Sequence, residues 1–295
     1  MATNIIDNIK VKYNAGSVLT RLIIINTIAF IMIKVIDVFL VLFNVYAFDI
    51  VTFLGVPANI SMLLNRFWTI ITYMFVHESL LHLFFNMLWL YWFGKIFMEY
   101  FTGRTLGSLY IMGGLAGAIL YVLAFNTIPY YVDMGRSWMI GASASVMAIV
   151  MGVALYRPEV SVNLLFLGQI KIVYIAIFAF ILDFLSLSSP TNPGGHVAHI
   201  GGAIAGYIFA MQYRNGKDIT IWMSKALDWL VGLTKRKKKS KINVEYVRNE
   251  SDWDYNKRKH DEQEEIDAIL DKLKKSGYNG LTNEEKKKLF DASKR

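Results

Sequence analysis

Apolar residues along the chain form six stretches that are long enough to cross a membrane. Each approaches the ~20 consecutive apolar residues that a spanning helix needs. The stretches lie at residues 20–43, 80–101, 105–125, 139–156, 169–187 and 195–213. The pattern therefore predicts an all-α membrane protein whose core is a six-transmembrane-helix bundle.

A weaker periodicity follows the sixth stretch. Apolar residues recur there at helical spacing, with Lys225 and Asp228 between them, which predicts an amphipathic helix on the inner membrane surface. These apolar residues are Trp222, Ala226, Trp229, Leu230 and Leu233. The basic run KRKKKSK at 235–241 comes next and is typical of an anchor that faces anionic lipid.

The end of the chain has the pattern of a small soluble helical module. One apolar stripe, formed by Ile266, Ile269, Leu270 and Leu273, stops at Gly277. Thr282 and Glu285 then have the spacing of a capping box, which predicts a second short helix. The expected parts are a cytoplasmic N-terminal segment (1–19), the six-helix core (20–213), the interfacial helix with its basic anchor (214–239), and a linker with the cytoplasmic module (240–295).

Composition supports a membrane protein. The 295 residues are 55% hydrophobic and 18% charged, and the mean hydropathy is +0.38. The net charge of +8 arises largely from lysines after residue 213, so it favours membrane lipids over nucleic acid as a partner. The absence of cysteine excludes disulfides and thiolate chemistry. The polar first 20 residues predict no removable signal peptide.

The loop charges alternate along the chain and predict an orientation. In one set of loops the only basic residues are Arg66 and Arg136. Most of the basic residues fall on the other side: Lys10, Lys12, Lys95, Arg104, Arg157, Lys171, Arg214 and Lys217. The positive-inside rule then places both termini in the cytoplasm. The aromatic loop at 44–79 is expected in the outer membrane interface, where such rings are favoured.

Polar side chains occur at one depth in three of the predicted spans. The second begins with His82 and Asn86, the fourth with Ser143, and the sixth with His199. Each lies on the order of 3–8 Å below the start of its span, at ~1.5 Å per residue. Because buried polar groups in membranes are costly, they are functional candidates. Together they supply a hydroxyl nucleophile, a base and oxyanion donors.

Two serines stand at the start of the fourth span, and helical geometry separates them. Ser145 shares a stripe with Gly141, Ala148 and Gly152, which predicts a packing surface. Ser143 points roughly to the opposite side, so it is the candidate nucleophile. The glycines after His199, in AHIGGAIAG, should let the sixth helix approach the fourth closely.

These residues resemble the rhomboid intramembrane serine proteases in their bacterial six-helix form. The resemblance covers roughly residues 15–215 and rests on HLFFN (82–86), GAS (141–143) and AHIGG (198–202). It implies a Ser-His dyad with Ser143 as the nucleophile and His199 as the general base. It further implies an oxyanion hole formed by His82, Asn86 and the Ser143 backbone N–H. The end of the chain also resembles a module that follows some bacterial rhomboids.

The sequence departs from the family pattern at several positions. Ala144 replaces the usual glycine after the nucleophile, and Met147 replaces a frequent aromatic residue beneath the histidine. Trp68 is followed by Thr69 in place of a frequent arginine. Asp183 could be a third member of a triad, but an interfacial role is the expectation because the family works as a dyad. His77 and His196 are interpreted as structural.

The leading hypothesis is a serine endopeptidase that cleaves peptide bonds in or near transmembrane segments of membrane-protein substrates. The resemblance implies a multi-pass protein of the bacterial inner membrane, with the site toward the outer face. The alternative is a catalytically inactive rhomboid-like protein that binds membrane clients. A transporter is disfavoured by the lack of repeat symmetry. No cofactor or metal is expected, because no H-E-x-x-H pattern or carboxylate cluster accompanies the histidines.

Overall fold

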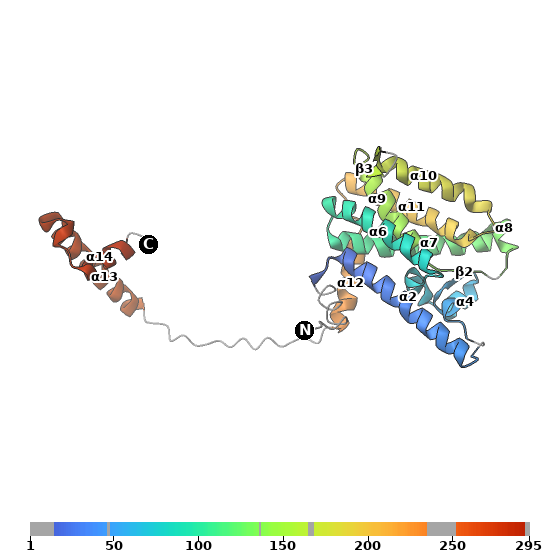
Figure 1. Ribbon diagram of the computed structural model, residues 1–295, viewed down its shortest axis with the longest axis horizontal. Coiled ribbons are helices and arrows are strands. Elements are labelled where there is room, and N and C mark those ends of the chain that lie inside the picture. The colour runs from blue at the N-terminus through green and yellow to red at the C-terminus, as the bar shows by residue number, and fades with distance from the viewer. Residues whose placement is uncertain (1–14, 46–47, 136, 165–167, 235–251, 293–295) are drawn as a thin grey trace. The chain divides into compact units, whose positions relative to one another are not determined.

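The computed structural model describes residues 15–45, 48–135, 137–164, 168–234 and 252–292. Its contacts divide the chain into two compact units, Met1–Lys235 and Arg236–Arg295. The first unit is a bundle of helices, and the second contains helices of its own (Figure 1).

Each of the six predicted stretches corresponds to a helix. These helices are α2 (Val18–Leu42), α6 (Leu80–Tyr100), α7 (Gly103–Thr127), α9 (Ser143–Tyr156), α10 (Ile172–Leu185) and α11 (Pro193–Arg214). Three of them, α2, α6 and α7, are long and apolar enough to cross a membrane by length and composition alone. The fold is the all-α membrane bundle that the hydrophobic pattern predicts.

Polar side chains fix where several of these helices begin. Ser17 caps α2, Ser79 caps α6 and Thr102 caps α7, each by accepting a hydrogen bond from a backbone N–H in the first turn. Asn192 caps α11 in the same way, from a left-handed backbone conformation with φ of 54°. Such caps satisfy N–H groups that have no partner within their own helix.

Helix α9 is the centre of the bundle. It contacts α6, α7, α10 and α11 (Figure 1), and every residue from Ala144 to Ala154 is buried. Its 14 residues extend over only about 21 Å at 1.5 Å per residue, against about 30 Å for a hydrocarbon core. A helix of this length is too short to cross the hydrocarbon core by itself, and Ser143 is its first residue.

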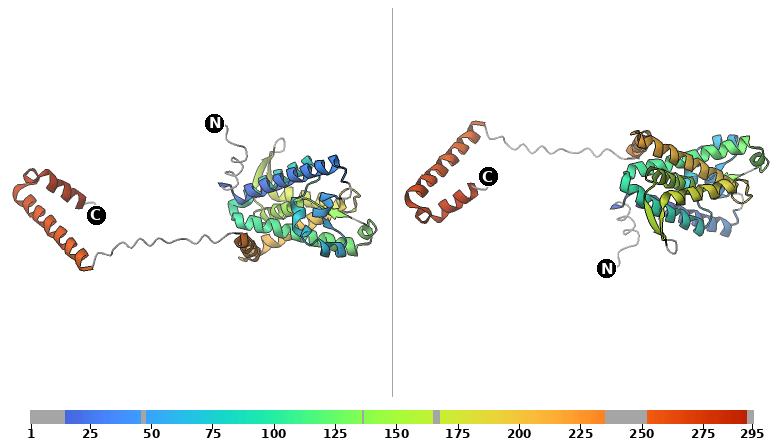
Figure 2. Two further views of the ribbon diagram at one scale, coloured as in Figure 1. Left: turned by 90° about the horizontal axis from the view of Figure 1, so that it is seen from below. Right: turned by 90° about the horizontal axis from the view of Figure 1, so that it is seen from above.

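The fourth and fifth helices start later than the sequence predicts. Residues 139–142 are not helical: strand β2 (Trp138–Met139) precedes a bend at Gly141, whose φ of 118° is incompatible with a right-handed helix. Residues 168–171 form strand β4 (Gly168–Lys171), paired antiparallel with β3 (Ser161–Leu164). Hydrophobicity alone cannot distinguish these short strands from the helices that follow them. Figure 2 shows β3 and β4 projecting from one end of the bundle.

The described residues of the aromatic loop at 44–79 form several short helices and one strand. It contains α3 (Ile50–Leu54), β1 (Val56–Pro57), α4 (Ile60–Asn65), α5 (Thr69–Thr72) and the 3-10 helix η1 (Tyr73–Phe75). Strand β1 pairs antiparallel with β2, with Val56 opposite Met139. The Trp68 indole N–H donates to the Phe53 carbonyl at 3.2 Å. Two further short helices, α8 (Pro129–Val132) and η2 (Ser186–Ser188), follow α7 and α10.

Helix α12 (Ile221–Thr234) confirms the helix that was predicted after the last span. One side of it packs on α7, with Met223 buried and the Ser224 hydroxyl 2.7 Å from that of Ser108. Trp222, Trp229 and Leu230 are exposed. The prediction that they face the inner membrane surface stays a prediction. The side chain of Leu233 and the basic run from residue 235 onward lie outside the described residues.

The described part of the second unit contains α13 (Asp252–Ser276), the 3-10 helix η3 (Tyr278–Gly280) and α14 (Asn283–Ala292). The predicted capping box is confirmed, because the Thr282 N–H donates to the Glu285 carboxylate at 2.7 Å and the Glu285 N–H donates to the Thr282 hydroxyl at 3.3 Å. Ile269, from the predicted apolar stripe, is buried. The linker at 240–251 lies outside the described residues.

Candidate active site

One cavity of about 360 Å³ brings together all four side chains that the sequence singled out. His82 and Asn86 reach it from α6, Ser143 from α9, and His199 from α11. Other lining residues are mainly apolar: Phe85, Trp89, Val146, Met147, Val150, Ala179 and Leu182. The cavity therefore combines a small polar cluster with an apolar wall.

The chain before Ser143 is shaped by Gly141. Its N–H donates to the Tyr73 carbonyl at 3.0 Å, which joins the bend to η1. A Cβ atom at this position would lie 2.9 Å from His82 Nε2 and 3.6 Å from Ser143 Oγ. Glycine at this position permits the positive φ. Because it has no side chain, it also leaves room for the His82 imidazole and the Ser143 hydroxyl beside the backbone of residue 141.

The two serines of α9 have the placements that helical geometry predicted. Ser143 lines the cavity, whereas Ser145 is fully buried. A Cβ atom on Gly114 of α7 would lie 2.8 Å from the Ser145 hydroxyl, so Ser145 is part of the contact between α7 and α9. Ser145 therefore lies on a packing surface as predicted, whereas Gly141, expected on the same helical stripe, precedes α9.

Glycines bring α11 against α9 as expected. A Cβ atom at Gly206 would lie 2.4 Å from the Ala148 carbonyl oxygen, so this position admits no side chain. This close approach places His199 beside the cavity that Ser143 lines. Among the described residues no hydrogen bond joins the Ser143 hydroxyl to His199, and such bonds commonly tighten only when substrate is present.

Asp183 of α10 contacts the ring of His199. Its Oδ1 lies 2.8 Å from His199 Nδ1 and 2.9 Å from His196 Nδ1. The interfacial role expected for Asp183 was wrong, because its side chain is 12% exposed and is held between two histidines of α11. The sequence carried a signal, since Asp183 is the only charged residue in α10. It could not show which way α10 faces.

The pair on α6 is joined by a hydrogen bond. The Asn86 amide donates to the His82 carbonyl at 2.9 Å, which leaves a second amide N–H available to a ligand. The ring of fully buried His77 meets that of His82 edge to face, with centroids 5.2 Å apart. His77 does not line the cavity, in agreement with a supporting position.

Comparisons with known proteins identify the family of this chain. The family model of the rhomboid domain matches residues 64–215, which contain all four predicted site residues. The chain belongs to the rhomboid family. RHOMBOID-like protein 12, mitochondrial, of Arabidopsis thaliana is 28% identical over 162 residues, which cover 52% of this chain. The match spans about half of that relative, 48% of its length.

A second family model matches residues 250–295 of this rhomboid and describes a family of unknown function (DUF6576). The matched residues coincide with the helices α13 and α14 of the second unit.

The departures from the rhomboid pattern are accommodated by the packing. Ala144 is buried, and its side chain faces Gly117 of α7. A Cβ atom added to Gly117 would lie only 2.6 Å from the Cβ atom of Ala144. A glycine on the neighbouring helix thus provides the room for the extra methyl group. Met147 lines the cavity together with His199, where its thioether can adapt to a neighbouring ring.

The groups Asp183, His196 and His199 each offer one potential metal-ligand atom, and these atoms lie within 4.8 Å of one another. Imidazole and carboxylate suit zinc and several other divalent metals. The same atoms are already paired by the two hydrogen bonds to Asp183. The prediction that the site uses no metal stays a prediction.

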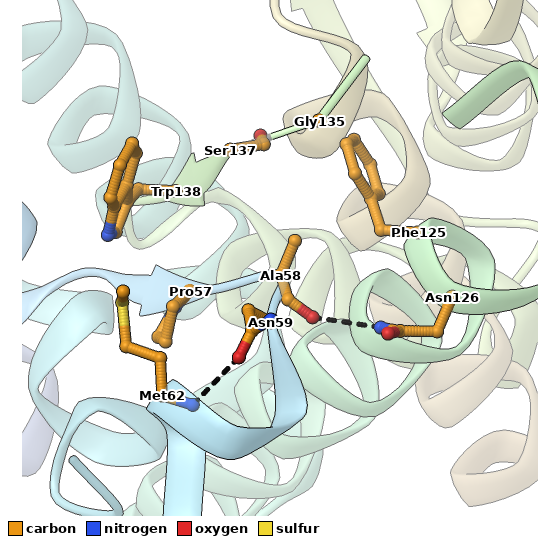
Figure 3. A pocket seen from close by; sticks show the side chains of 9 residues that line it. All are labelled: Pro57, Ala58, Asn59, Met62, Phe125, Asn126, Gly135, Ser137 and Trp138. Carbon is orange, nitrogen blue, oxygen red and sulfur yellow. Dashed lines mark hydrogen bonds between the residues drawn. The ribbon is translucent and has the colours of Figure 1, made fainter. Parts of the chain in front are cut away.

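A further cavity of about 270 Å³ lies beside strand β2, which leads to Ser143 (Figure 3). Its lining includes Pro57, Asn59, Asn126 and Trp138, and none of the predicted site residues. In Figure 3 the Asn126 amide points to the Ala58 carbonyl, at 2.8 Å. This hydrogen bond joins the end of α7 to Ala58, the residue after β1. Strand β1 pairs with β2, and β2 precedes Ser143 in the chain.

Proposed function

We propose that this rhomboid is an intramembrane serine endopeptidase that cleaves peptide bonds in or near transmembrane segments of other membrane proteins. The observation that carries the proposal is the single cavity lined by Ser143, His199, His82 and Asn86. A hydroxyl, an imidazole base and two further donors are the set that acyl transfer requires. No cofactor is part of the proposal.

In the proposed reaction, His199 Nε2 takes the proton of the Ser143 hydroxyl as Oγ bonds to the substrate carbonyl carbon. The carbonyl electron pair moves to oxygen, and the oxyanion is held by the Ser143 backbone N–H, His82 and Asn86. His199 then gives its proton to the leaving amine as the C–N bond breaks. Water repeats the sequence on the acyl-enzyme and releases the second product.

The proposed reaction also indicates which substrates are suitable. A transmembrane helix hides its carbonyl groups in hydrogen bonds, so a substrate must unwind locally before Ser143 can reach one. Residues with low helix propensity near the cleavage point reduce that cost, by up to about 1 kcal/mol for each glycine. The proposed substrates are therefore membrane proteins with such residues close to a membrane surface, and membrane lipids are the other partner.

The orientation and compartment belong to the same proposal. The loop charges favour cytoplasmic termini and a site toward the outer face of a bacterial inner membrane. The division into a six-helix core, an interfacial helix and a cytoplasmic module at 240–295 is proposed with it. No predicted catalytic residue lies in the module.

The test compares purified wild type, Ser143→Ala and Ser145→Ala with a model transmembrane substrate in detergent or liposomes. Cleavage should disappear in Ser143→Ala and persist in Ser145→Ala, because only Ser143 lines the cavity. A fluorophosphonate should label the wild type and Ser145→Ala, but not Ser143→Ala. If folded wild type neither cleaves nor labels yet binds membrane clients, the inactive client-binding alternative is correct.

A further inference from the structure

We infer that Asp183 is a positioning residue for His199, so that the site works as a Ser-His-Asp arrangement in which His196 holds the carboxylate. The inference rests on the proposed function and extends it. Its basis is geometric: Asp183 Oδ1 is within 2.9 Å of the Nδ1 atoms of both histidines. These rings belong to residues one helical turn apart on α11.

The hydrogen bond decides which nitrogen of His199 can act as a base. An ionised carboxylate only accepts hydrogen bonds, so the proton of neutral His199 must lie on Nδ1. Nε2 then carries the lone pair and can take the Ser143 proton. Without Asp183 the imidazole could adopt the other tautomer or rotate, and either change would remove the base from the cavity.

The same contact stabilises the charge that forms during the reaction. His199 becomes an imidazolium when it takes the serine proton, and the carboxylate already lies 2.8 Å away. The side chains of Asp183 and His199 are 12% and 19% exposed, so water screens this attraction only partly. The proton stays on His199 throughout, and Asp183 remains ionised.

His196 gives the carboxylate a second partner. A carboxylate between apolar helices is costly unless its lone pairs are used, and the rest of α10 contributes no charge. By donating from Nδ1 at 2.9 Å, His196 fixes the position of Asp183 relative to α11. The other titratable group that lines the same cavity is His82 on α6.

The experiment uses full-length protein and measures kcat and KM separately on the model substrate, with unfolding midpoints for every variant. Asp183→Asn keeps the shape of the side chain and should lower kcat by about 100-fold or more, with little change in KM. Asp183→Glu should recover part of that loss. His196→Gln should be milder than Asp183→Asn. Asp133→Asn makes the same chemical change at an exposed carboxylate outside the cavity and should leave kcat unchanged.

Fluorophosphonate labelling separates positioning from folding. Asp183→Asn should slow the labelling rate of Ser143 while the final labelled fraction equals that of wild type. A reduced final fraction at the normal rate, or an unchanged kcat in folded Asp183→Asn, would overturn the inference while leaving the protease function intact. Inactive wild type would instead refute the proposed function. Activity that EDTA removes and zinc restores would make the three groups metal ligands and overturn the positioning role.

Discussion

Gly202 of α11 lies so close to the backbone of Ala144 in α9 that a Cβ atom on Gly202 would be 2.1 Å from the Ala144 carbonyl oxygen. Because the obstacle is backbone, no rotation of a side chain can relieve the overlap. Gly202 is one turn beyond His199, and Ala144 follows Ser143. The contact therefore sets the distance between the two elements that carry the proposed nucleophile and base.

Gly202→Ala should therefore separate α9 from α11. Overpacking of this kind costs about 1–3 kcal/mol, and the displaced His199 should lower the cleavage rate even in the folded fraction. The measurement is the unfolding midpoint together with kcat in the same detergent. Gly232→Ala is the matched control, because Gly232 is helical and nothing lies within 4 Å of its added Cβ. Equal behaviour of the two variants would show that this packing is not critical.

The oxyanion donors make a second prediction. His82→Ala and Asn86→Ala should each lower kcat roughly 10- to 1000-fold, as expected when one donor to a developing oxyanion is lost. Asn86 supports this assignment because one N–H of its amide remains after the bond to the His82 carbonyl. Steady-state kinetics on the two single variants and the double variant provide the check. Wild-type rates in all three, with folding preserved, would assign this pair a structural role.

The sequence predicted the helices and the polar cluster because both depend on local pattern. Runs of apolar residues specify helices in a membrane, and the spacing from His82 to Asn86 places both on one face. It did not predict the pairing of β1 with β2 or the late start of α9, since these follow from contacts between distant segments. The hydrogen bond from His199 to Asp183 was missed for the same reason: it depends on how α10 is rotated against α11.

The C-terminal module should lose part of its stability in acid. The hydrogen bond from Lys272 Nζ, at 2.8 Å, holds the pKa of the Glu285 carboxyl below its usual range, and the Thr282 N–H adds to this. A depressed pKa in the folded state means that the stabilisation is complete above the unfolded value, about 4.3 for glutamate, and is lost as the pH falls through the lower folded value.

A carboxyl NMR titration of the full-length protein in micelles measures this directly. The Glu285 resonance should titrate below the usual range in wild type and return toward it in Lys272→Ala. Glu284→Gln is the control: Glu284 neighbours Glu285 in the first turn of α14, and its side chain accepts no hydrogen bond among the described residues. A Glu285 pKa in the usual range in wild type would contradict the hydrogen bonds that Lys272 and Thr282 donate to this carboxylate.

The last prediction concerns the side of the membrane toward which the chemistry faces. One end of the bundle is formed where α6 and α9 end, near the last turn of α11, and the rings of Phe101, Tyr156 and Tyr213 meet there. Basic groups gather at the same end, since Arg157 lies over the Tyr100 ring and the Arg214 guanidinium donates to the Tyr156 carbonyl. The site residues lie near the opposite ends of these three helices.

The positive-inside rule assigns the basic end to the cytoplasm, so the cavity with Ser143 should open toward the outer face. A membrane-impermeant fluorophosphonate added to intact cells stripped of their outer barrier should label Ser143, while a tag after residue 295 stays protected from added protease. Ser143→Ala is the control for the label, and detergent lysis is the control for the tag. If the tag is digested in sealed cells and Ser143 reacts only after lysis, the topology is inverted and substrates would be cut near their cytoplasmic ends.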